Sequence, residues 1–190
     1  MPEEEPVVDA DSWKSALLDL FGGGWTFAQV GPRRHDDWRR DMTALMALKA
    51  VDPRHWASLN YAPDNENRGG TNSPFFPWSP EETGASLHEV GVESAGRLLV
   101  ALQGDLYQAS SIPDFEQRKE GLFRSARTIL SRFGANSRFF TNAAEARRDP
   151  NADLLNPDTE WDCLSVYITD CGLVAVSDTE IGVFWAFWDD

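Results

Sequence analysis

The run from Ile181 to Trp188 has large apolar side chains on both of the faces that a β-strand would present. Side chains alternate between the faces of a strand, so a strand with two apolar faces has to be covered on both sides. We expect either a central strand covered twice by the protein itself, or a strand covered on one face by a partner. The two faces carry Ile181, Val183, Trp185 and Phe187, and Phe184, Ala186 and Trp188.

The residues before this run predict two further strands. Residues 163–168 alternate apolar and polar side chains, which is typical of a half-buried strand. A turn is expected at Asp170-Cys171-Gly172, a second strand at residues 173–177 and a second turn at residues 178–180. The C-terminal part of the chain should therefore form a three-stranded antiparallel meander.

Helices are predicted over most of the preceding sequence, because apolar residues recur there at helical spacing. Gly22 and Gly134 suit the ends of the first and last long helices. The expected helices cover residues 11–21, 35–51, 86–108, 113–133 and 142–148, and short strands cover residues 25–30 and 55–61. The helix over 113–133 has a second, cationic face with Arg118, Lys119, Arg124, Arg127 and Arg132.

The expected fold class is α+β, with helices from the N-terminal three quarters packed on an antiparallel sheet centred on the C-terminal three-stranded meander. The length of 190 residues predicts a single domain over residues 10–190, preceded by a flexible acidic tail at residues 1–9. Residues 62–85 contain four prolines and three glycines, which predicts a long loop. Its aromatic residues 75–78 favour a loop pinned to the core, although it could also border a binding site.

The formal net charge is -14, and residues 149–190 contain ten carboxylates and no lysine or arginine. Recognition of phosphates requires a basic surface, so direct binding to nucleic acid or to anionic membranes is disfavoured. A basic protein is the natural electrostatic complement, because opposite charges accelerate encounter. The alternative is that the negative charge serves only to keep the protein soluble.

Cys163 and Cys171 are the only cysteines, and the expected meander holds them too far apart for a disulfide. Two free thiols suggest a reducing compartment. The N-terminus lacks the features of a secretory signal, and no apolar run approaches the length of about 20 residues that spans a bilayer. A cytoplasmic location is the simplest expectation.

The sequence contains no phosphate-binding glycine motif and no nucleophile elbow. A zinc site from His35, His55, Cys163 and Cys171 is not favoured by their spacing. The charged residues 35–41 predict an exposed helix start with ion pairs. We therefore expect no enzyme, no catalytic residue, no metal site and no cofactor.

The acidic residues 161–190 and the compact α+β layout resemble small bacterial immunity proteins, which protect a cell from a toxin. The resemblance is one of character rather than of a motif. It implies a cytosolic inhibitor that neutralises a basic toxin, such as a nuclease, by stoichiometric binding. Two alternatives remain: a DNA mimic that inhibits a DNA-binding protein, and an enzyme or small-molecule binder with an unrecognised site.

The partner-binding residues are expected on the C-terminal meander. Aromatic side chains would anchor the partner, and carboxylates at the turns would steer its approach. The predicted contact residues are Asp170, Asp178, Glu180, Trp185, Trp188, Asp189 and Asp190.

Overall fold

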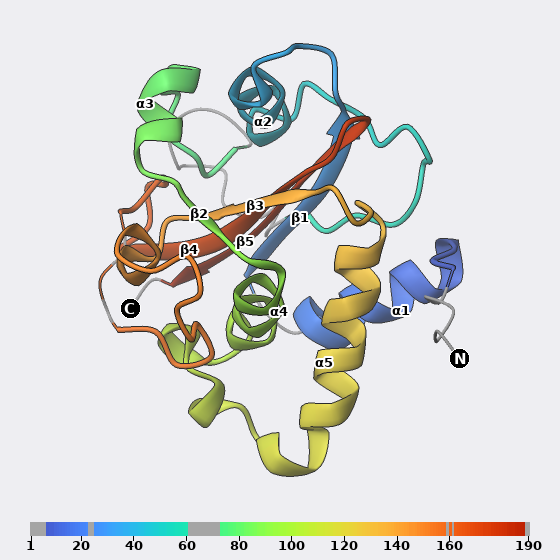
Figure 1. Ribbon diagram of the computed structural model, residues 1–190, viewed down its shortest axis with the longest axis vertical. Coiled ribbons are helices and arrows are strands. Elements are labelled where there is room, and N and C mark those ends of the chain that lie inside the picture. Colours follow the sequence, from blue (N-terminus) through green and yellow to red (C-terminus); the bar gives the residue numbers. More distant parts are fainter. Residues whose placement is uncertain (1–6, 23–24, 61–72, 159, 161, 189–190) are drawn as a thin grey trace.

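The computed structural model describes residues 7–22, 25–60, 73–158, 160 and 162–188. Its centre is a five-stranded antiparallel sheet with the strand order β1-β5-β4-β3-β2 (Figure 1). The fold is α+β, as expected, but the sheet has five strands where three were predicted. The strands are β1 (Thr26–Pro32), β2 (His88–Val90), β3 (Arg138–Thr141), β4 (Thr169–Val176) and β5 (Glu180–Trp188).

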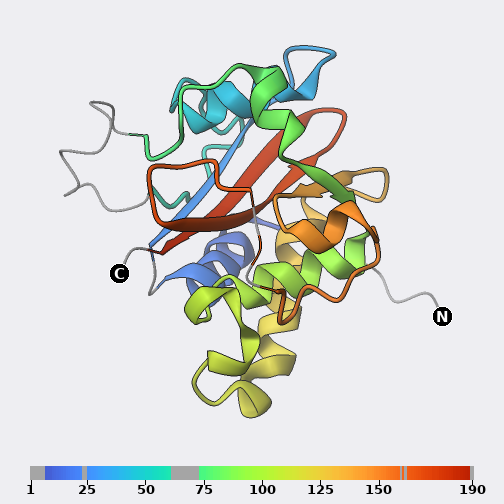
Figure 2. The same cartoon turned by 90° about the vertical axis from the view of Figure 1, so that its left-hand side faces the viewer.

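Helices cover both faces of this sheet (Figures 1 and 2). One face packs against α1, α4 and α5, and the other lies beneath α2, α3 and the segments around residues 75 and 164. A separate apolar core fills each side. The helices are α1 (Ala10–Phe21), α2 (Trp38–Met46), α3 (Pro80–Ala85), α4 (Val92–Ala101) and α5 (Phe115–Ser131), and short 3-10 turns occur at Asp105–Tyr107, Ala109–Ser111 and Ala144–Arg147.

β5 is an internal strand of the sheet, hydrogen-bonded to β1 on one side and β4 on the other. Trp185 belongs to the core beneath α2, and Phe184 belongs to the core formed with α1 and α5. Both side chains are 0% exposed. The protein itself therefore covers both apolar faces of β5, which confirms the first of the two alternatives.

The expected turn at residues 170–172 is wrong, because these residues lie inside β4. Gly172 pairs with Trp185 across the sheet, and a Cβ atom at this position would lie 2.2 Å from Trp185 Cε3. The glycine permits this close approach of the indole. Residues 163–168 form only one bridge, between Ser165 and Phe75. The predicted meander is thus a β4–β5 hairpin, extended on its two sides by β1 and β3.

α1 confirms its prediction closely. From the sequence, either Asp9 or Asp11 could cap this helix; Asp9 does so in a capping box with Ser12, and Gly22 follows the end of the helix. The buried face carries Trp13, Ala16, Leu17, Leu20 and Phe21. Residues 1–6 of the predicted tail lie outside the described residues.

The other helices are shorter than expected. The predicted helix over 86–108 contains β2 and α4, and α2 ends at Met46. Part of the predicted loop forms α3, which has a capping box between Ser79 and Glu82, while residues 61–72 lie outside the described residues. Phe75 is buried against Phe27 and Trp185, so this described part of the loop is pinned to the core as expected.

Candidate functional site

The predicted contact residues do not form one surface. Asp170 and Trp185 are 0% exposed and Glu180 is 4% exposed, so these three have no surface to offer a partner and their expected exposure is wrong. The remaining four are Asp178, which is exposed, Trp188, which is half-buried, and Asp189 and Asp190, which lie outside the described residues.

Buried Asp170 binds residues 163–168, the segment that was expected to form a strand. Its carboxylate accepts hydrogen bonds from the backbone N–H groups of Leu164 (3.0 Å) and Ser165 (2.9 Å), from Trp185 Nε1 (2.8 Å) and from Asn142 Nδ2 (3.1 Å). Burial raises the pKa of Asp170 above its usual value, while these hydrogen bonds act in the opposite direction. The carboxylate therefore fixes residues 163–168 against the sheet.

The β4–β5 hairpin has two ends of different character. The turn end comprises residues 177–180. The open end lies at the antiparallel pair Thr169–Trp188.

At the turn end, Glu180 binds a buried guanidinium. The side chain of Arg132 is 0% exposed and donates to Asp52 at 2.6 and 2.9 Å and to Glu180 at 2.8 and 3.2 Å. Its guanidinium also lies 4.6 Å from the ring centroid of Trp13 and 4.8 Å from that of Trp56. Burial opposes the charge, but these hydrogen bonds outweigh it and raise the pKa of Arg132 above its usual value. Arg132 is thus no part of an exposed cationic face.

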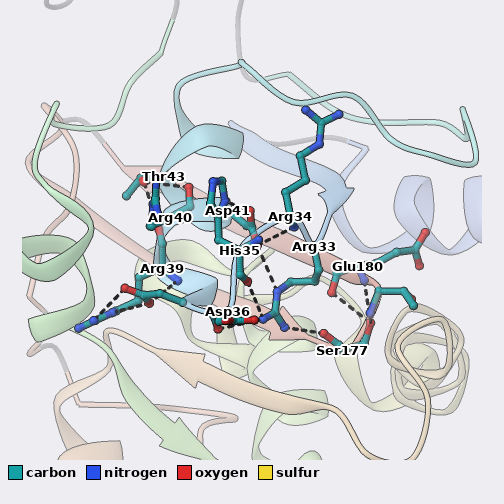
Figure 3. A network of polar contacts seen from close by, with 12 residues as sticks. Arg33, Arg34, His35, Asp36, Arg39, Arg40, Asp41, Thr43, Ser177 and Glu180 are labelled. Atoms are coloured by element: carbon teal, nitrogen blue, oxygen red, sulfur yellow. Dashed lines mark hydrogen bonds and ion pairs between the residues drawn. The ribbon is translucent and has the colours of Figure 1, made fainter.

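A second network joins the residues before α2 to the turn end (Figure 3). Arg33 donates from Nη1 to the carbonyl of Ser177 at 2.7 Å and from Nε to Asp41 at 3.2 Å. Asp41 also accepts from the backbone N–H groups of Arg34 and His35, and its Oδ1 lies 2.7 Å from His35 Nδ1. Burial raises the pKa of Asp41, but these hydrogen bonds outweigh burial and lower it overall. The predicted ion-paired helix start exists, although Asp41 is 4% exposed rather than on the surface.

The open end carries a hollow of about 680 Å³ between α1, the end of β5 and the segment after α4. Leu18 is 51% exposed and Trp25 is 45% exposed at this hollow, and Trp188 is half-buried beside them. Large side chains that lie this exposed around a concave surface are typical of interaction sites. The buried part of the lining includes Phe21, Tyr107, Ala186 and Phe187.

Polar side chains, among them Asp19, Gln103, Asp105 and Arg118, share the lining of the hollow. Asp19 accepts a hydrogen bond from Ser125 Oγ at 2.7 Å, and Arg118 donates to Gln103 Oε1 at 3.4 Å. Gln103 Nε2 is buried and has no hydrogen-bond partner within the described structure. Among the described residues, neither Asp19 nor Asp105 forms an ion pair.

The residues 105–107 form a ridge between this hollow and a second cavity of about 490 Å³. Leu106 (φ 49°) and Tyr107 (φ 60°) both have left-handed backbone conformations, which are costly for residues other than glycine. Tyr107 is held by a hydrogen bond from its hydroxyl to the carbonyl of Thr169, while Leu106 is 38% exposed. The smaller cavity is lined by Leu106, Ala144, Arg147, Glu160, Asp162, Cys163, Ile168 and Thr169.

The cysteines give little support to nucleophilic chemistry. Both are free thiols, as expected, but Cys171 is 0% exposed inside β4 instead of at a turn. Burial raises the pKa of Cys163 and of Cys171 above their usual values, and a protonated thiol is a poor nucleophile. Within the described part of the chain, no group of three or more His, Cys, Asp or Glu side chains could hold a metal ion.

Comparison with protein-family models, with curated proteins and with solved structures finds no match to this chain. None of the helices in the described ranges has the length and the hydrophobicity that crossing a bilayer requires. The candidate site therefore rests on the geometry of the open end alone.

Sequence reasoning identified Trp188 but missed its neighbours at the open end. Leu18 carries a detectable signal, because it is a large apolar residue outside the buried stripe of α1. Leu106 was assigned to the apolar stripe of a helix that in fact ends at Ala101. Its outward position depends on the backbone conformation of residues 106 and 107, for which the sequence has no glycine signal.

Proposed function

We propose that this protein is an acidic protein-binding module that neutralises a basic protein, in the manner of an immunity protein, by stoichiometric binding through the open end. The observation that carries the proposal is the combination, at one concave surface, of exposed apolar side chains and of carboxylates that form no ion pair with any described residue. Leu18 and Trp25 supply the apolar groups of the hollow, Leu106 adds an exposed apolar group on the adjoining ridge, and Asp19 and Asp105 supply the carboxylates.

The position of the remaining charge supports a basic partner. Of the carboxylates in residues 149–190, Asp170 and Glu180 are buried, whereas the segment 149–162 keeps exposed carboxylates at Asp149, Asp153, Asp158 and Glu160. This segment lies beside the ridge, since Gln108 Nε2 donates to the carbonyl of Pro157. An acidic margin next to an apolar centre would steer a basic protein toward the hollow.

The aromatic side chains of the hollow favour an immunity-type binder over the alternative of a DNA mimic. Interfaces between proteins depend on a few aromatic anchors surrounded by polar residues. A DNA mimic instead has to present carboxylates in place of phosphates along a groove. The exposed side chains of Trp25 and Leu18 in the lining of the hollow suit the first arrangement.

Co-purification from the organism that encodes the chain, followed by expression of the identified partner alone and together with it, tests the proposal. We expect a basic partner that is toxic alone and harmless when co-expressed. A partner that is acidic, or that remains toxic during co-expression, would refute the proposed function.

Variants then locate the surface. Trp25→Ala should speed dissociation of the partner about tenfold or more, because tryptophan anchors at interfaces typically contribute about 2 kcal/mol or more. Trp78→Ala is the matched control, because Trp78 is 39% exposed but lies next to α3, away from the hollow. Equal effects of the two substitutions would exclude the open end as the binding surface.

A further inference from the structure

The two ends of the hairpin contain similar sets of side chains. At the turn end, two indole rings and two carboxylates surround the guanidinium of Arg132. At the open end, Trp25, Trp188, Asp19 and Asp105 line one hollow that opens to solvent. The second set has the same chemical complement, arranged at a surface instead of in the core.

We propose that the hollow at the open end receives an arginine side chain of the basic partner, with its guanidinium against the indole rings and paired with Asp105. This inference rests on the proposed function and names the chemical group that the surface recognises. The protein then binds its partner with the interaction that it uses internally around Arg132.

The charge balance of the hollow favours one additional cation. The lining contains two carboxylates and the guanidinium of Arg118. Arg118 directs its N–H groups to the carbonyl of Pro113 at 3.3 Å and to Gln103 Oε1 at 3.4 Å. Asp105 keeps an exposed carboxylate that forms no ion pair within the described residues, so a partner's cation can bind it without displacing an internal pair.

The aromatic lining favours arginine over lysine. A guanidinium is planar, stacks on aromatic faces and is more weakly hydrated than an ammonium group. The hollow of about 680 Å³ is within the range of about 300–1,000 Å³ that is common for ligand sites. It therefore has room for the side chain and for part of the backbone that carries it.

Gln103 supplies a further point of recognition. Its Nε2 is buried and lacks an acceptor in the described structure, which is costly for an amide group. Once this amide turns toward the hollow, a backbone carbonyl next to the inserted arginine can accept its hydrogen bond. The hollow thus matches an exposed arginine on an extended segment of the partner.

A blocked tripeptide, N-acetyl-Gly-Arg-Gly-amide, tests this inference without the partner. Titration into the ¹⁵N-labelled protein should shift the indole N–H signals of Trp25 and Trp188 in a saturable way. The citrulline tripeptide, which has the same shape without the charge, should bind at least tenfold more weakly. Asp105→Asn should weaken binding of the arginine tripeptide at least fivefold, whereas Asp178→Asn, an exposed carboxylate at the turn end, should leave it unchanged.

Three results would overturn the inference: no saturable shift, equal binding of the citrulline tripeptide, or an Asp105→Asn protein that binds as well as the original. These outcomes are separate from failure of the proposed function. Neutralisation of a basic toxin, with loss of affinity in Trp25→Ala, would stand even if the hollow did not select arginine.

Discussion

The two ends of the β4–β5 hairpin use the same types of residue in opposite ways. At the turn end, the carboxylates of Asp52 and Glu180 point inward, because the chain supplies Arg132 as their counter-ion. At the open end, aromatic and carboxylate side chains face solvent around a hollow. Carboxylates are therefore internal at the turn end, where Arg132 pairs with them, and exposed at the open end, where Asp19 and Asp105 form no ion pair among the described residues.

This difference has an energetic basis. Removing a charged group from water costs roughly several kcal/mol, unless a well-placed counter-ion and further hydrogen bonds offset this cost. Arg132 meets this condition with four hydrogen bonds to two carboxylates. Asp170 is buried without a cation, because backbone, amide and indole N–H groups bind its carboxylate. Carboxylates with neither kind of partner stay at the surface, where an external cation can bind them.

The largest effect is expected from removing the cation at the turn end. Arg132→Ala should lower the free energy of unfolding by about 3–5 kcal/mol, because it leaves buried Asp52 without an ion pair among the described residues and leaves buried Glu180 with Arg54 alone. Denaturant unfolding at neutral pH measures this change. Arg127→Ala, an exposed arginine on the same helix, should stay within about 0.5 kcal/mol of the original protein. Similar costs for the two substitutions would contradict the contrast between the ends.

The second effect is the response of the turn end to acid. The pKa of Asp41 is lowered in the folded protein, so its ionised form stabilises the fold at pH values above the unfolded pKa of about 3.9. This stabilisation is lost as the pH falls through the lowered folded value. Asp41→Asn should cost about 1–3 kcal/mol at pH 7, because it leaves buried donors without an acceptor.

Unfolding free energies measured from pH 7 down to pH 2.5 test this expectation. The difference between Asp41→Asn and the original protein should shrink as the pH falls through the acid range. Asp36→Asn is the control, since Asp36 is exposed and Arg33 contacts only its backbone carbonyl. A difference that stays constant with pH would show that Asp41 does not act through its charge.

The sequence predicted those elements whose determinants are local. α1 has its cap at Asp9, its apolar stripe and its terminal Gly22 within one short segment, and all of them were recognised. β5 was recognised because its apolar pattern admits few alternatives. Gly172 was wrongly predicted as a turn residue. A glycine is required there because the indole of Trp185, on a different strand, packs against its backbone.

The candidate site was less predictable, because burial of charge depends on contacts between distant segments. Glu180 and Arg132 are separated by 48 positions, and Asp52 and Arg132 by 80. Nothing near Glu180 in the sequence indicates that its carboxylate is internal. Trp188 could be nominated from composition, but its grouping with Leu18 and Trp25 required the three-dimensional arrangement of β1, β5 and α1.

The smallest effect on stability is expected at the ridge of the open end. Leu106 has a left-handed backbone conformation, which costs about 1–2 kcal/mol for a residue with a Cβ atom, and asparagine tolerates it better. Leu106→Asn and Leu106→Ala both remove the exposed apolar side chain, but only Leu106→Asn also relieves strain. We therefore expect Leu106→Asn to be the more stable of the two by about 1 kcal/mol.

The unfolding temperatures of the two variants and their affinities for the identified partner test whether Leu106 serves the binding surface or the fold. Both substitutions should weaken binding to a similar degree, because both remove the apolar group at the tip of the ridge. Leu106→Asn should weaken binding without lowering the stability of the fold. The turn-end substitutions, in contrast, should lower the stability. If Leu106→Asn unfolded at a lower temperature than Leu106→Ala, or bound the partner as tightly as the original protein, Leu106 would serve the fold and not the surface.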